Sequence, residues 1–485
     1  MNRKLIFRML GALLLIEDAA MVPAFILSLI YQDGDAPAIA LSMMILLLVG
    51  GGLFLGLKRN PDDHLRLKEG FLITAFGWLL LALFGCLPFL FSGTLPRFED
   101  AFFETVSGLT TTGASVVTRF SGFPRGVMFW RATTHWIGGM GVLVLTLALL
   151  PKLTGRTAHL VKAESPGPSL SKLVPKTGAT AKILYRIYIG LSLTEFVILM
   201  FCGLNPYDAA IHTMSTAGTG GFSNYGASVA AFNNPLVEMV ITVFMLCYGV
   251  NFALYYKFLI GDHFRAFIRD EEFRWYFFLA CGFIVAVTLN NLSFYSGNLL
   301  TSLRYSAFQV ASVMSTTGFV TADFNLWPAT SQVLLLIIMF IGSCAGSTAG
   351  GMKVIRVNML IKMSRRNIRA ALHPKKVDVV RIDGKAVDET MLSQVALFAF
   401  MYGALVLLGA LILSTSAPYD TLTHLTASLT CVSNVGPGLG FVGPVENFAG
   451  YGIVGKFTCS MLMLSGRLEL LPLFILFTGS AWHKY

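Results

Sequence analysis

The chain has 485 residues, of which 55% are hydrophobic and only 13% are charged. Its mean hydropathy of +0.69 excludes an ordinary soluble globular protein and indicates a polytopic membrane protein. The formal charge of +10 does not indicate a nucleic-acid partner, because the basic residues lie in short segments between apolar runs, where positive charge marks the cytoplasmic side of a membrane protein.

Two apolar runs open the chain, at about 5–31 and 38–57. Each is long enough for a spanning helix of about 20 residues, and we interpret them as an accessory hairpin. The turn between them is acidic and basic residues follow the second run, which places the turn outside. Glu17 and Asp18 lie inside the first run, where a carboxylate must face protein or the membrane interface. We therefore expect a structural role for this pair.

The rest of the chain repeats one pattern four times: an apolar span, a shorter amphipathic segment, a loop that ends in glycine, and a second apolar span. The predicted spans are 70–92 and 126–150, 183–203 and 235–260, 273–295 and 329–362, and 391–414 and 449–482. With the hairpin this gives ten spans. Simple alternation then places 29 of the 36 Lys and Arg residues on one side. A bias this strong supports the whole topology, with both termini cytoplasmic.

These patterns divide the chain into five units. They are an accessory hairpin at 1–69, repeat 1 at 70–151, repeat 2 at 182–262, repeat 3 at 273–363 and repeat 4 at 390–485. The glycine-bearing loops of the repeats fall at 110–114, 218–222, 315–319 and 433–437. Repeat 3 also carries a stretch of small residues at 342–353, which we expect to form an intramembrane loop because so many small residues break a helix.

The amphipathic segments have about a dozen residues, or roughly 18 Å as helix, and are too short to cross a hydrocarbon core of about 30 Å. They must enter the membrane and turn back. Irregular backbone at membrane depth is tolerated only where it is buried in protein or lines water, so four such loops predict a shared pore. Each short helix would aim its partially negative C-terminal end at the centre, which favours a cation there.

Glycine permits the backbone turn that lets successive carbonyl oxygens replace the hydration shell of an ion. Four glycines stand at matching offsets from the short segments, although the fourth loop departs most from the others. The predicted K+-binding filter residues are Thr111, Thr112, Gly113, Thr219, Gly220, Gly221, Thr316, Thr317, Gly318, Asn434, Val435 and Gly436. The fold class expected is therefore an all-α polytopic membrane protein with four pseudo-fourfold, potassium-channel-like M1-P-M2 repeats plus an N-terminal two-helix hairpin.

Arg467 lies inside the last apolar span, where an arginine costs at least about 2.5–3.5 kcal/mol unless it faces a cavity or a partner. One alternative is a structural pair with Glu469 or with a backbone carbonyl. For the stretch at 342–353 an alternative is close helix packing through Gly346 and Gly350. A phosphate-binding P-loop is a poorer rival, because no Ser or Thr follows Lys353 and the setting is not βαβ.

These features resemble the pore subunits of the Trk/Ktr/HKT superfamily of potassium transporters, and within it the bacterial TrkH type. The resemblance rests on the four glycine loops, the hairpin and the run Trp136-Ile137-Gly138-Gly139-Met140-Gly141. It implies that glycine in all four loops gives the potassium-selective form, that the 342–353 stretch obstructs the pore below the filter, and that Arg467 points into the conduction path. The gate residues implied are Gly346, Gly350, Gly351, Lys353 and Arg467.

The same resemblance implies partners and a location. It implies a homodimer in the bacterial inner membrane that works with a cytosolic nucleotide-binding regulatory ring of the TrkA type. No cofactor is expected in this chain beyond the transported K+, and ATP/ADP or NAD(H) is expected only on the ring. The basic segments 152–186 and 353–385 are the predicted docking faces, and contact with lipid headgroups is the alternative for those charges.

Other readings of the chain remain open. An ion-coupled potassium symporter, using H+ or Na+, could use the same pore. The histidines at 135, 159, 212, 263, 373 and 424 show no metal-ligand spacing, and seven cysteines lie mostly inside apolar runs, where free thiols are expected. The sequence offers no set of nucleophile, base and oxyanion donors, so we expect a protein that is not an enzyme.

Overall fold

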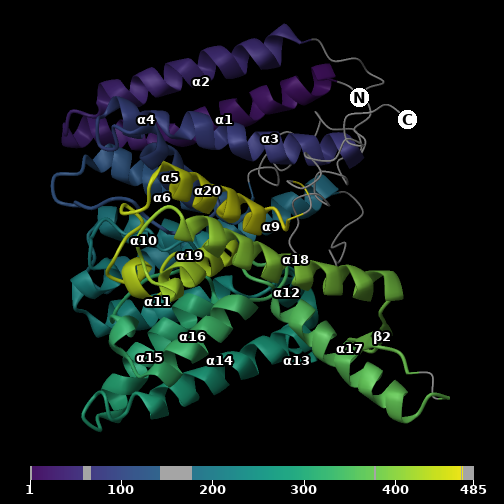
Figure 1. Ribbon diagram of the computed structural model, residues 1–485. Coiled ribbons are helices and arrows are strands. Elements are labelled where there is room, and N and C mark those ends of the chain that lie inside the picture. Colours follow the sequence, from purple (N-terminus) through teal and green to yellow (C-terminus); the bar gives the residue numbers. More distant parts are fainter. Residues whose placement is uncertain (1–2, 58–66, 142–176, 376–377, 471, 473–485) are drawn as a thin grey trace.

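Helices form nearly all of the regular structure (Figure 1). The computed structural model describes residues 3–57, 67–141, 177–375, 378–470 and 472. Within these residues, six helices are long and apolar enough to cross a membrane, and a bent pair would make a seventh. The expected fold class, an all-α polytopic membrane protein, is confirmed.

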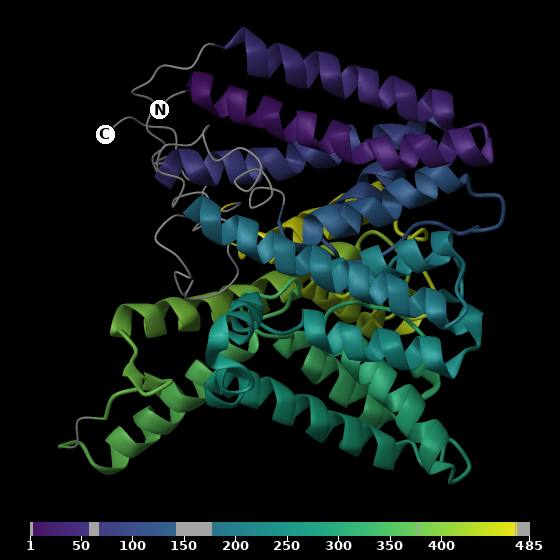
Figure 2. The ribbon, with the colours of Figure 1, turned by 180° about the vertical axis from the view of Figure 1, so that it is seen from behind.

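The accessory hairpin consists of α1 (Arg3–Tyr31) and α2 (Ala36–Gly56), which lie side by side along one edge of the molecule in both views (Figures 1 and 2). Glu17 of α1 is 2% exposed and its Oε1 lies against Gly85, on the helix of repeat 1 that packs next to α1. Glu17 thus faces protein rather than lipid, as a carboxylate at this depth must.

Most remaining elements fall in the four units that the sequence predicts as repeats, and several helices run past the predicted bounds. Repeat 1 contains α3 (Leu67–Gly85), α4 (Leu87–Phe91), α5 (Phe98–Leu109) and α6 (Arg125–Gly139). Repeat 2 contains α9 (Thr177–Phe201), α10 (Pro206–Gly218), η1 (Ser228–Phe232), α11 (Pro235–Tyr248), α12 (Phe252–Lys257) and η2 (Phe258–Asp262). After α13 (Arg265–Arg269), repeat 3 contains α14 (Glu271–Asn290), α15 (Leu299–Met314), η3 (Phe324–Leu326), α16 (Ala329–Ile341) and α17 (Val354–Leu372). Repeat 4 contains α18 (Glu389–Ser414), α19 (Thr421–Ser433), η4 (Gly440–Val442) and α20 (Ile453–Arg467).

One short amphipathic helix stands in each repeat, and we call these the short helices: α5, α10, α15 and α19. Side-chain caps fix where three of them begin, since Asn205, Asn298 and Asp420 each accept a hydrogen bond from a backbone amide of the first turn. Their last turns are buried in protein on every side. That burial explains how helices so rich in Ser, Thr and Gly can lie inside a membrane protein.

The short helices are enclosed by the same contacts in every repeat. Each packs against a helix that precedes it and a helix that follows it in its own repeat, and against the corresponding following helix of the preceding repeat. Thus α10 contacts α9, α11 and α6, α15 contacts α14, α16 and α11, and α19 contacts α18, α20 and α16. The ring closes because α5 contacts α3, α6 and α20, which belongs to repeat 4. The four repeats are therefore arranged around one centre.

Two predicted spans are interrupted. The run 329–362 breaks after α16, and residues 342–353, which we call the intramembrane loop, separate α16 from α17. The run 235–260 was expected to be one span, but α11 and the segment Phe252–Gly261 meet at 91°. The bend falls where the intramembrane loop docks, since Gly249 accepts a bond from the Cys344 amide (3.1 Å) and the Phe252 amide donates to Gly346 (3.0 Å).

Two further spans are described only in part. The helix of the predicted span 126–150 ends at Gly139, and the helix of 449–482 ends at Arg467. Residues 142–150 and most residues after 470 lie outside the described part of the chain, as does most of the basic segment 152–186.

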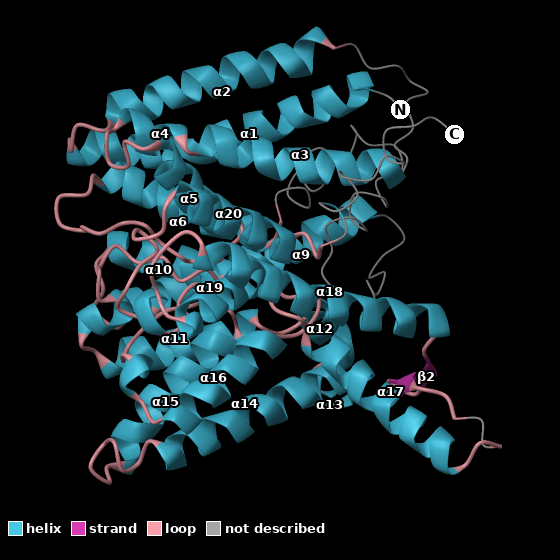
Figure 3. Ribbon diagram, in the orientation of Figure 1, coloured by secondary structure: helices cyan, strands magenta, loops and turns pink. Residues whose placement is uncertain are grey.

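Helix α17 extends beyond the bundle, and a small antiparallel hairpin, β1 (Arg381–Ile382) and β2 (Lys385–Ala386), lies beside it, where Lys362 donates to the Arg381 carbonyl (2.7 Å) (Figure 3). We call the projecting helix α17 with this hairpin the α17 arm, and Glu271, at the start of α14, holds it. Its carboxylate accepts hydrogen bonds from the Asn358 amide (2.8 Å) and from the Lys362 ammonium group. The arm is thus fixed to the first turn of α14 along one side.

Candidate functional site

All four short helices end in the same way. At the end of α5 the Thr111 amide donates to the Gly108 carbonyl (3.0 Å) and the Thr112 amide donates to the Ser107 carbonyl (2.9 Å). This pair of bonds is the Schellman motif, which ends a helix when the next residue adopts a left-handed conformation. The matching pairs in the other repeats start from Thr219 and Gly220, Thr316 and Thr317, and Asn434 and Val435. The four loops therefore leave their helices with one shared geometry.

The left-handed residue of each motif is not glycine. These residues, each with a φ of 55°, are Thr111, Thr219, Thr316 and Asn434. A β-branched residue at positive φ is a true outlier, and strain of this kind costs about 1–3 kcal/mol and persists only where the surroundings enforce it. Two residues later a glycine again has positive φ: Gly113 (79°), Gly221 (77°), Gly318 (80°) and Gly436 (106°). Strain repeated at three equivalent threonines points to function, and Asn434 adopts the same φ with less strain.

The four glycines form a closed ring. A Cβ atom added to Gly113 would lie 1.9 Å from the Gly220 carbonyl oxygen in the next loop. Around the ring, the Cβ of Gly221 would meet the Thr317 oxygen at 2.1 Å, that of Gly318 the Val435 oxygen at 2.0 Å, and that of Gly436 the Thr112 oxygen at 2.6 Å. Each glycine is thus required twice, by its φ and by the carbonyl beside it. This arrangement brings Thr112 into contact with Gly436, which lies 324 positions later in the sequence.

The fourth loop differs from the other three. Its left-handed residue is Asn434, whose amide nitrogen donates to the Thr112 hydroxyl (2.9 Å) and to the Met463 carbonyl (2.9 Å). Gly436 also has a larger φ than the other three glycines, and its added Cβ would lie farther from the neighbouring carbonyl oxygen, that of Thr112. The ring is therefore closed between loops 4 and 1 by a side-chain hydrogen bond as well as by backbone packing.

The intramembrane loop contacts two of these four loops. The Gly350 amide donates to the Thr316 hydroxyl (2.7 Å), and the Gly351 amide donates to the Ser433 carbonyl (2.9 Å) at the end of α19. A Cβ on Gly350 would lie 2.2 Å from that same Ser433 oxygen. Gly346 is non-helical, with a φ of 71°. Packing of a continuous small-residue helix through Gly346 and Gly350, one alternative left open by the sequence, is therefore wrong.

Arg467 joins the intramembrane loop to repeat 1. Its guanidinium donates to the Thr348 carbonyl (2.8 Å) and to the carbonyls of Gly138 (2.5 Å) and Gly139 (2.6 Å), at the end of α6. Glu469 instead accepts from Arg356 at 2.6 Å, so backbone carbonyls rather than Glu469 hold the arginine. The guanidinium thus spans the space between the loop and the opposite side of the ring.

Two side chains secure the loop at its base. Lys353 is 2% exposed, has a φ of 81°, and donates through Nζ to the Ala349 carbonyl. Glu272, in the first turn of α14, accepts from the amides of Ala345 (2.6 Å) and Ile355 (3.2 Å), one on each flank of the turn. Glu272 could not be selected from the sequence, because its partners are backbone amides more than 70 residues away.

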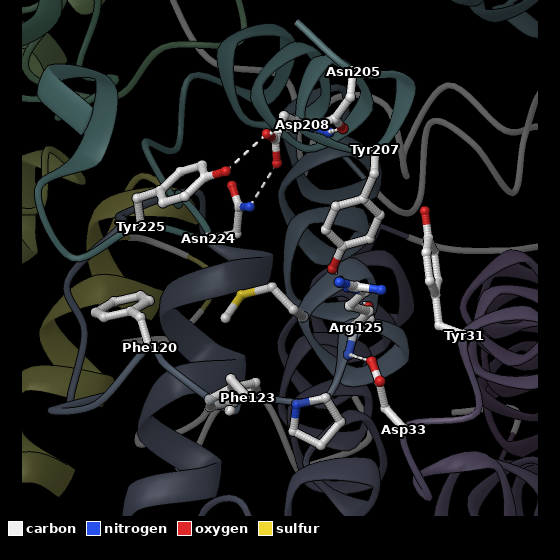
Figure 4. A pocket seen from close by; sticks show the side chains of 13 residues that line it. Tyr31, Asp33, Phe120, Phe123, Arg125, Asn205, Tyr207, Asp208, Asn224 and Tyr225 are labelled. Carbon is white, nitrogen blue, oxygen red and sulfur yellow. Dashed lines mark hydrogen bonds between the residues drawn. The ribbon is translucent and has the colours of Figure 1, made fainter. Parts of the chain in front are cut away.

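On the face that carries the α1–α2 turn, a pocket of about 520 Å³ lies between the accessory hairpin and repeats 1 and 2 (Figure 4). Asp33 accepts from the Arg125 amide (3.0 Å), and the Arg125 guanidinium stacks on Tyr31 at 4.3 Å. Asp208, opposite, accepts from Tyr225 (2.9 Å) and Asn224 (2.7 Å). The Asp33–Arg125 bond joins the hairpin to repeat 1, and the Tyr207 hydroxyl, which donates to the Arg125 carbonyl (2.9 Å), joins repeat 2 to repeat 1.

The histidines and cysteines add no further site among the described residues. His135 bonds through Nδ1 to the Gly108 carbonyl (2.8 Å) and stacks on Phe222, and His212 bonds to the Ser223 hydroxyl (3.0 Å). Both side chains pack behind the glycine loops. All seven cysteines are free thiols.

The sequence matches the profile of the family described as cation transport protein, TrkH, over residues 35–484. The chain belongs to the TrkH family. The resemblance inferred from the glycine loops is thereby confirmed. As a member of this family of transport proteins, the chain is a multi-pass membrane protein and not an enzyme.

Curated members of the TrkH family are similar along the whole chain. The Trk system potassium uptake protein TrkH of Salmonella typhimurium (strain LT2) is 36% identical over 489 residues and covers 100% of both chains. The Trk system potassium uptake protein TrkG of Escherichia coli (strain K12) is 33% identical, with 99% of each chain covered. The crystal structure of the potassium transporter TrkH from Vibrio parahaemolyticus matches with a TM-score of 0.89 and 32% identity over 100% of each chain.

Proposed function

We propose that this TrkH family member conducts K+ into a bacterial cell through a pore at the centre of the four repeats, with the ring of glycine loops as its selectivity filter. The observation that carries the proposal is the ring itself. One carbonyl from each quarter, at positions 112, 220, 317 and 435, lies against the glycine of a neighbouring loop. The relatives named as potassium uptake proteins support K+ as the ion.

The physical basis is the replacement of water by carbonyl oxygens. K+ loses its hydration shell only where backbone carbonyls take its place around one axis. All four short helices direct their C-terminal ends toward the ring, and the partial negative charge there favours a cation. The proposed K+ ligands are the backbone carbonyl oxygens of residues 111–113, 219–221, 316–318 and 434–436.

We assign the gate to the intramembrane loop and Arg467. Gly350 and Gly351 bond directly to residues of filter loops 3 and 4, so the loop lies against the filter. Arg467 places a positive charge beside the same loop, which opposes the passage of a cation. Gly346 permits the turn because glycine adopts a positive φ without strain, and Lys353 is held at positive φ with its ammonium group bonded to the Ala349 carbonyl.

The remaining assignments follow the charge pattern. We propose that the units 1–69, 70–151, 182–262, 273–363 and 390–485 are the hairpin and the four pore repeats. Both termini would lie in the cytoplasm of a bacterium, with the protein in the inner membrane. The face with the α1–α2 turn would then be the outer one.

Ion flux into liposomes containing the purified protein tests this function. Accumulation of K+ that follows the K+ gradient alone, with Na+ excluded, is the expected result. An absolute need for a gradient of H+ or Na+ would instead establish the coupled symporter, and equal flux of K+ and Na+ would overturn the filter assignment.

We further propose that the chain forms a homodimer and binds a cytosolic nucleotide-binding ring of the TrkA type, which would carry the ATP/ADP or NAD(H). The α17 arm is the docking face, because it extends beyond the bundle and exposes Arg365 and the apolar side chains of Ile368 and Leu372. Two neighbouring arginines are already paired, Arg366 with Glu389 and Arg369 with Asp378.

Neutralising Arg365, Arg366 and Arg369 together is expected to abolish copurification of the ring, because docking at this arm would depend on their charge. The control replaces Arg97 and Arg119, which are exposed on the face proposed to lie outside. Retention of the ring by the triple variant would rule out this docking face, and binding to anionic lipid vesicles alone would assign the charges to lipid.

A further inference from the structure

A second ring of contacts lies just beyond the glycines. The segment that leaves each filter loop is held by the preceding repeat. The Phe448 amide of repeat 4 donates to Ser115 (2.9 Å), and the Ala230 amide of repeat 2 donates to Val320 (3.1 Å). Between repeats 3 and 4, the Asn325 side chain makes two hydrogen bonds to the backbone of Gly440 (3.0 and 3.1 Å). Three of the four junctions are thus closed by the outer loop of the preceding repeat.

The junction between repeats 1 and 2 is closed by Arg131, which comes from a helix. This residue of α6 donates through a terminal nitrogen to the Ser223 carbonyl (3.0 Å), two residues after Gly221. Its guanidinium carbon lies 3.4 Å from the centre of the Phe222 ring. Contact with both Phe222 and Ser223 fixes the start of the segment that leaves filter loop 2.

Arg131 also holds the segment that leaves filter loop 1. Another of its terminal nitrogens donates to the Ser115 hydroxyl (3.1 Å), and Nε donates to the Glu104 carboxylate (2.6 Å). Glu104 in turn accepts from the Ser115 hydroxyl (2.9 Å) and from the Val116 amide (2.9 Å). The Arg131 and Glu104 side chains are 2% and 0% exposed. One buried ion pair therefore connects both segments, two residues beyond Gly113 and Gly221.

In repeats 2 and 3 the position of Glu104 holds an uncharged polar side chain. His212 and Gln309 stand at the same spacing before their glycines, and His212 bonds to Ser223, the counterpart of Ser115. In repeat 4 that position is Ala427, and the hydroxyl of Thr426, one residue earlier, accepts from the Leu439 amide (3.0 Å). A neutral side chain is sufficient to support a single loop. The charge of Glu104 is explained by its second interaction, the ion pair with the Arg131 guanidinium, which reaches a neighbouring loop.

We propose that Arg131 and Glu104 are positioning residues for ion selectivity: they set the separation of filter loops 1 and 2 and so the size of the carbonyl ring. The proposal rests on the assignment of the glycine ring as a K+ filter. The pair does not contact the ion. Its bonds end two or three residues beyond Gly113 and Gly221, and rigid, fork-shaped donation by arginine is suited to holding two backbones at a fixed distance.

The test must avoid leaving one buried charge alone, because an unpaired buried charge destabilises the whole protein. The main variant is therefore the double substitution Glu104→Leu with Arg131→Met, which keeps side-chain volume and removes both charges. The matched control is Glu238→Leu with Arg304→Met, since Arg304 donates twice to Glu238 (2.6 Å each) between α15 and α11. That pair also joins two repeats and makes no hydrogen bond to a filter loop in the described part of the chain.

The readout is competition between K+ and Na+ for flux into liposomes, with the melting temperature in detergent measured alongside. We expect the main variant to lose about tenfold in K+ over Na+ selectivity, which corresponds to about 1.4 kcal/mol. The control is expected to melt earlier but to keep its selectivity. The proposal is overturned if the main variant folds and its selectivity stays within twofold of that of the original protein. It is also overturned if the control loses as much selectivity as the main variant.

Two additional variants keep the test decisive. If the double variant does not fold, Arg131→Lys is used, because lysine keeps the charge and loses the fork that reaches both loops. The same loss of selectivity is expected from Arg131→Lys, and full selectivity overturns the proposal. Gly113→Ser is measured in parallel. If Gly113→Ser also keeps full selectivity, the filter assignment has failed. If Gly113→Ser loses selectivity while the variants of Arg131 and Glu104 keep it, only the proposed role of Arg131 and Glu104 is refuted.

Discussion

Replacing Gly113 with serine is expected to abolish most discrimination between K+ and Na+. A side chain at this position would collide with the Gly220 carbonyl, because even a Cβ would lie 1.9 Å from that oxygen. The φ of 79° adds strain for any residue other than glycine. The carbonyl must move, so the ring loses the geometry that replaces the hydration shell of K+. We expect selectivity to fall by at least about tenfold, or about 1.4 kcal/mol.

A matched glycine provides the control for this substitution. Gly190 lies in α9 with nothing near the position of an added Cβ. Gly190→Ser should therefore leave both flux and selectivity unchanged, while Gly221→Ser and Gly318→Ser should behave like Gly113→Ser. Selectivity that survives replacement of all four ring glycines in a folded protein would show that the ring is not the filter.

The second large effect is expected from Arg467→Ala, which should raise K+ flux through the protein in the absence of any partner. The arginine donates to the Thr348 carbonyl of the intramembrane loop and to two carbonyls of α6. Alanine removes these three bonds together with the positive charge. Loss of a hydrogen bond from a charged donor weakens an interaction by about 1.5–3 kcal/mol, enough to shift a closed loop toward an open state.

Lysine at the same position separates the two parts of this effect. Arg467→Lys keeps a positive charge but cannot reach carbonyls on both sides as a fork can. High flux in both variants would assign closure to the bridge between the loop and α6, and high flux in the alanine variant alone would assign it to charge. Flux in Arg467→Ala equal to that of the unmodified protein, measured by uptake into liposomes, would remove Arg467 from the gate.

Features fixed by local backbone chemistry could be predicted from the sequence. The four glycines were recognisable because positive φ restricts the residue type and because the pattern recurs four times. Arg467 was recognisable because its charge is costly in an apolar run. Its partners were not, since the Thr348 and Gly138 carbonyls carry no signature in the sequence and meet Arg467 only after the repeats close.

Features that depend on the assembled repeats could not be predicted. Nothing in the sequence distinguishes Arg131, yet it is buried against Glu104, 27 positions away, and against Ser223 of another repeat. The bend near Gly249 lies inside an unbroken apolar run, and hydropathy does not distinguish a bent span from a straight one. That bend is explained only by the docking of the intramembrane loop beside it.

The central claim is that the ring of Gly113, Gly221, Gly318 and Gly436 binds the transported ion. Anomalous diffraction from crystals grown with Rb+ in place of K+ tests it most directly, because Rb+ is close to K+ in size and gives a measurable anomalous signal. The account predicts an anomalous peak on the axis of the ring, within coordination distance of the backbone oxygens of residues 112, 220, 317 and 435, which disappears when Na+ replaces Rb+. Rb+ peaks elsewhere in the protein with none at the ring, in crystals of protein that conducts Rb+, would contradict it.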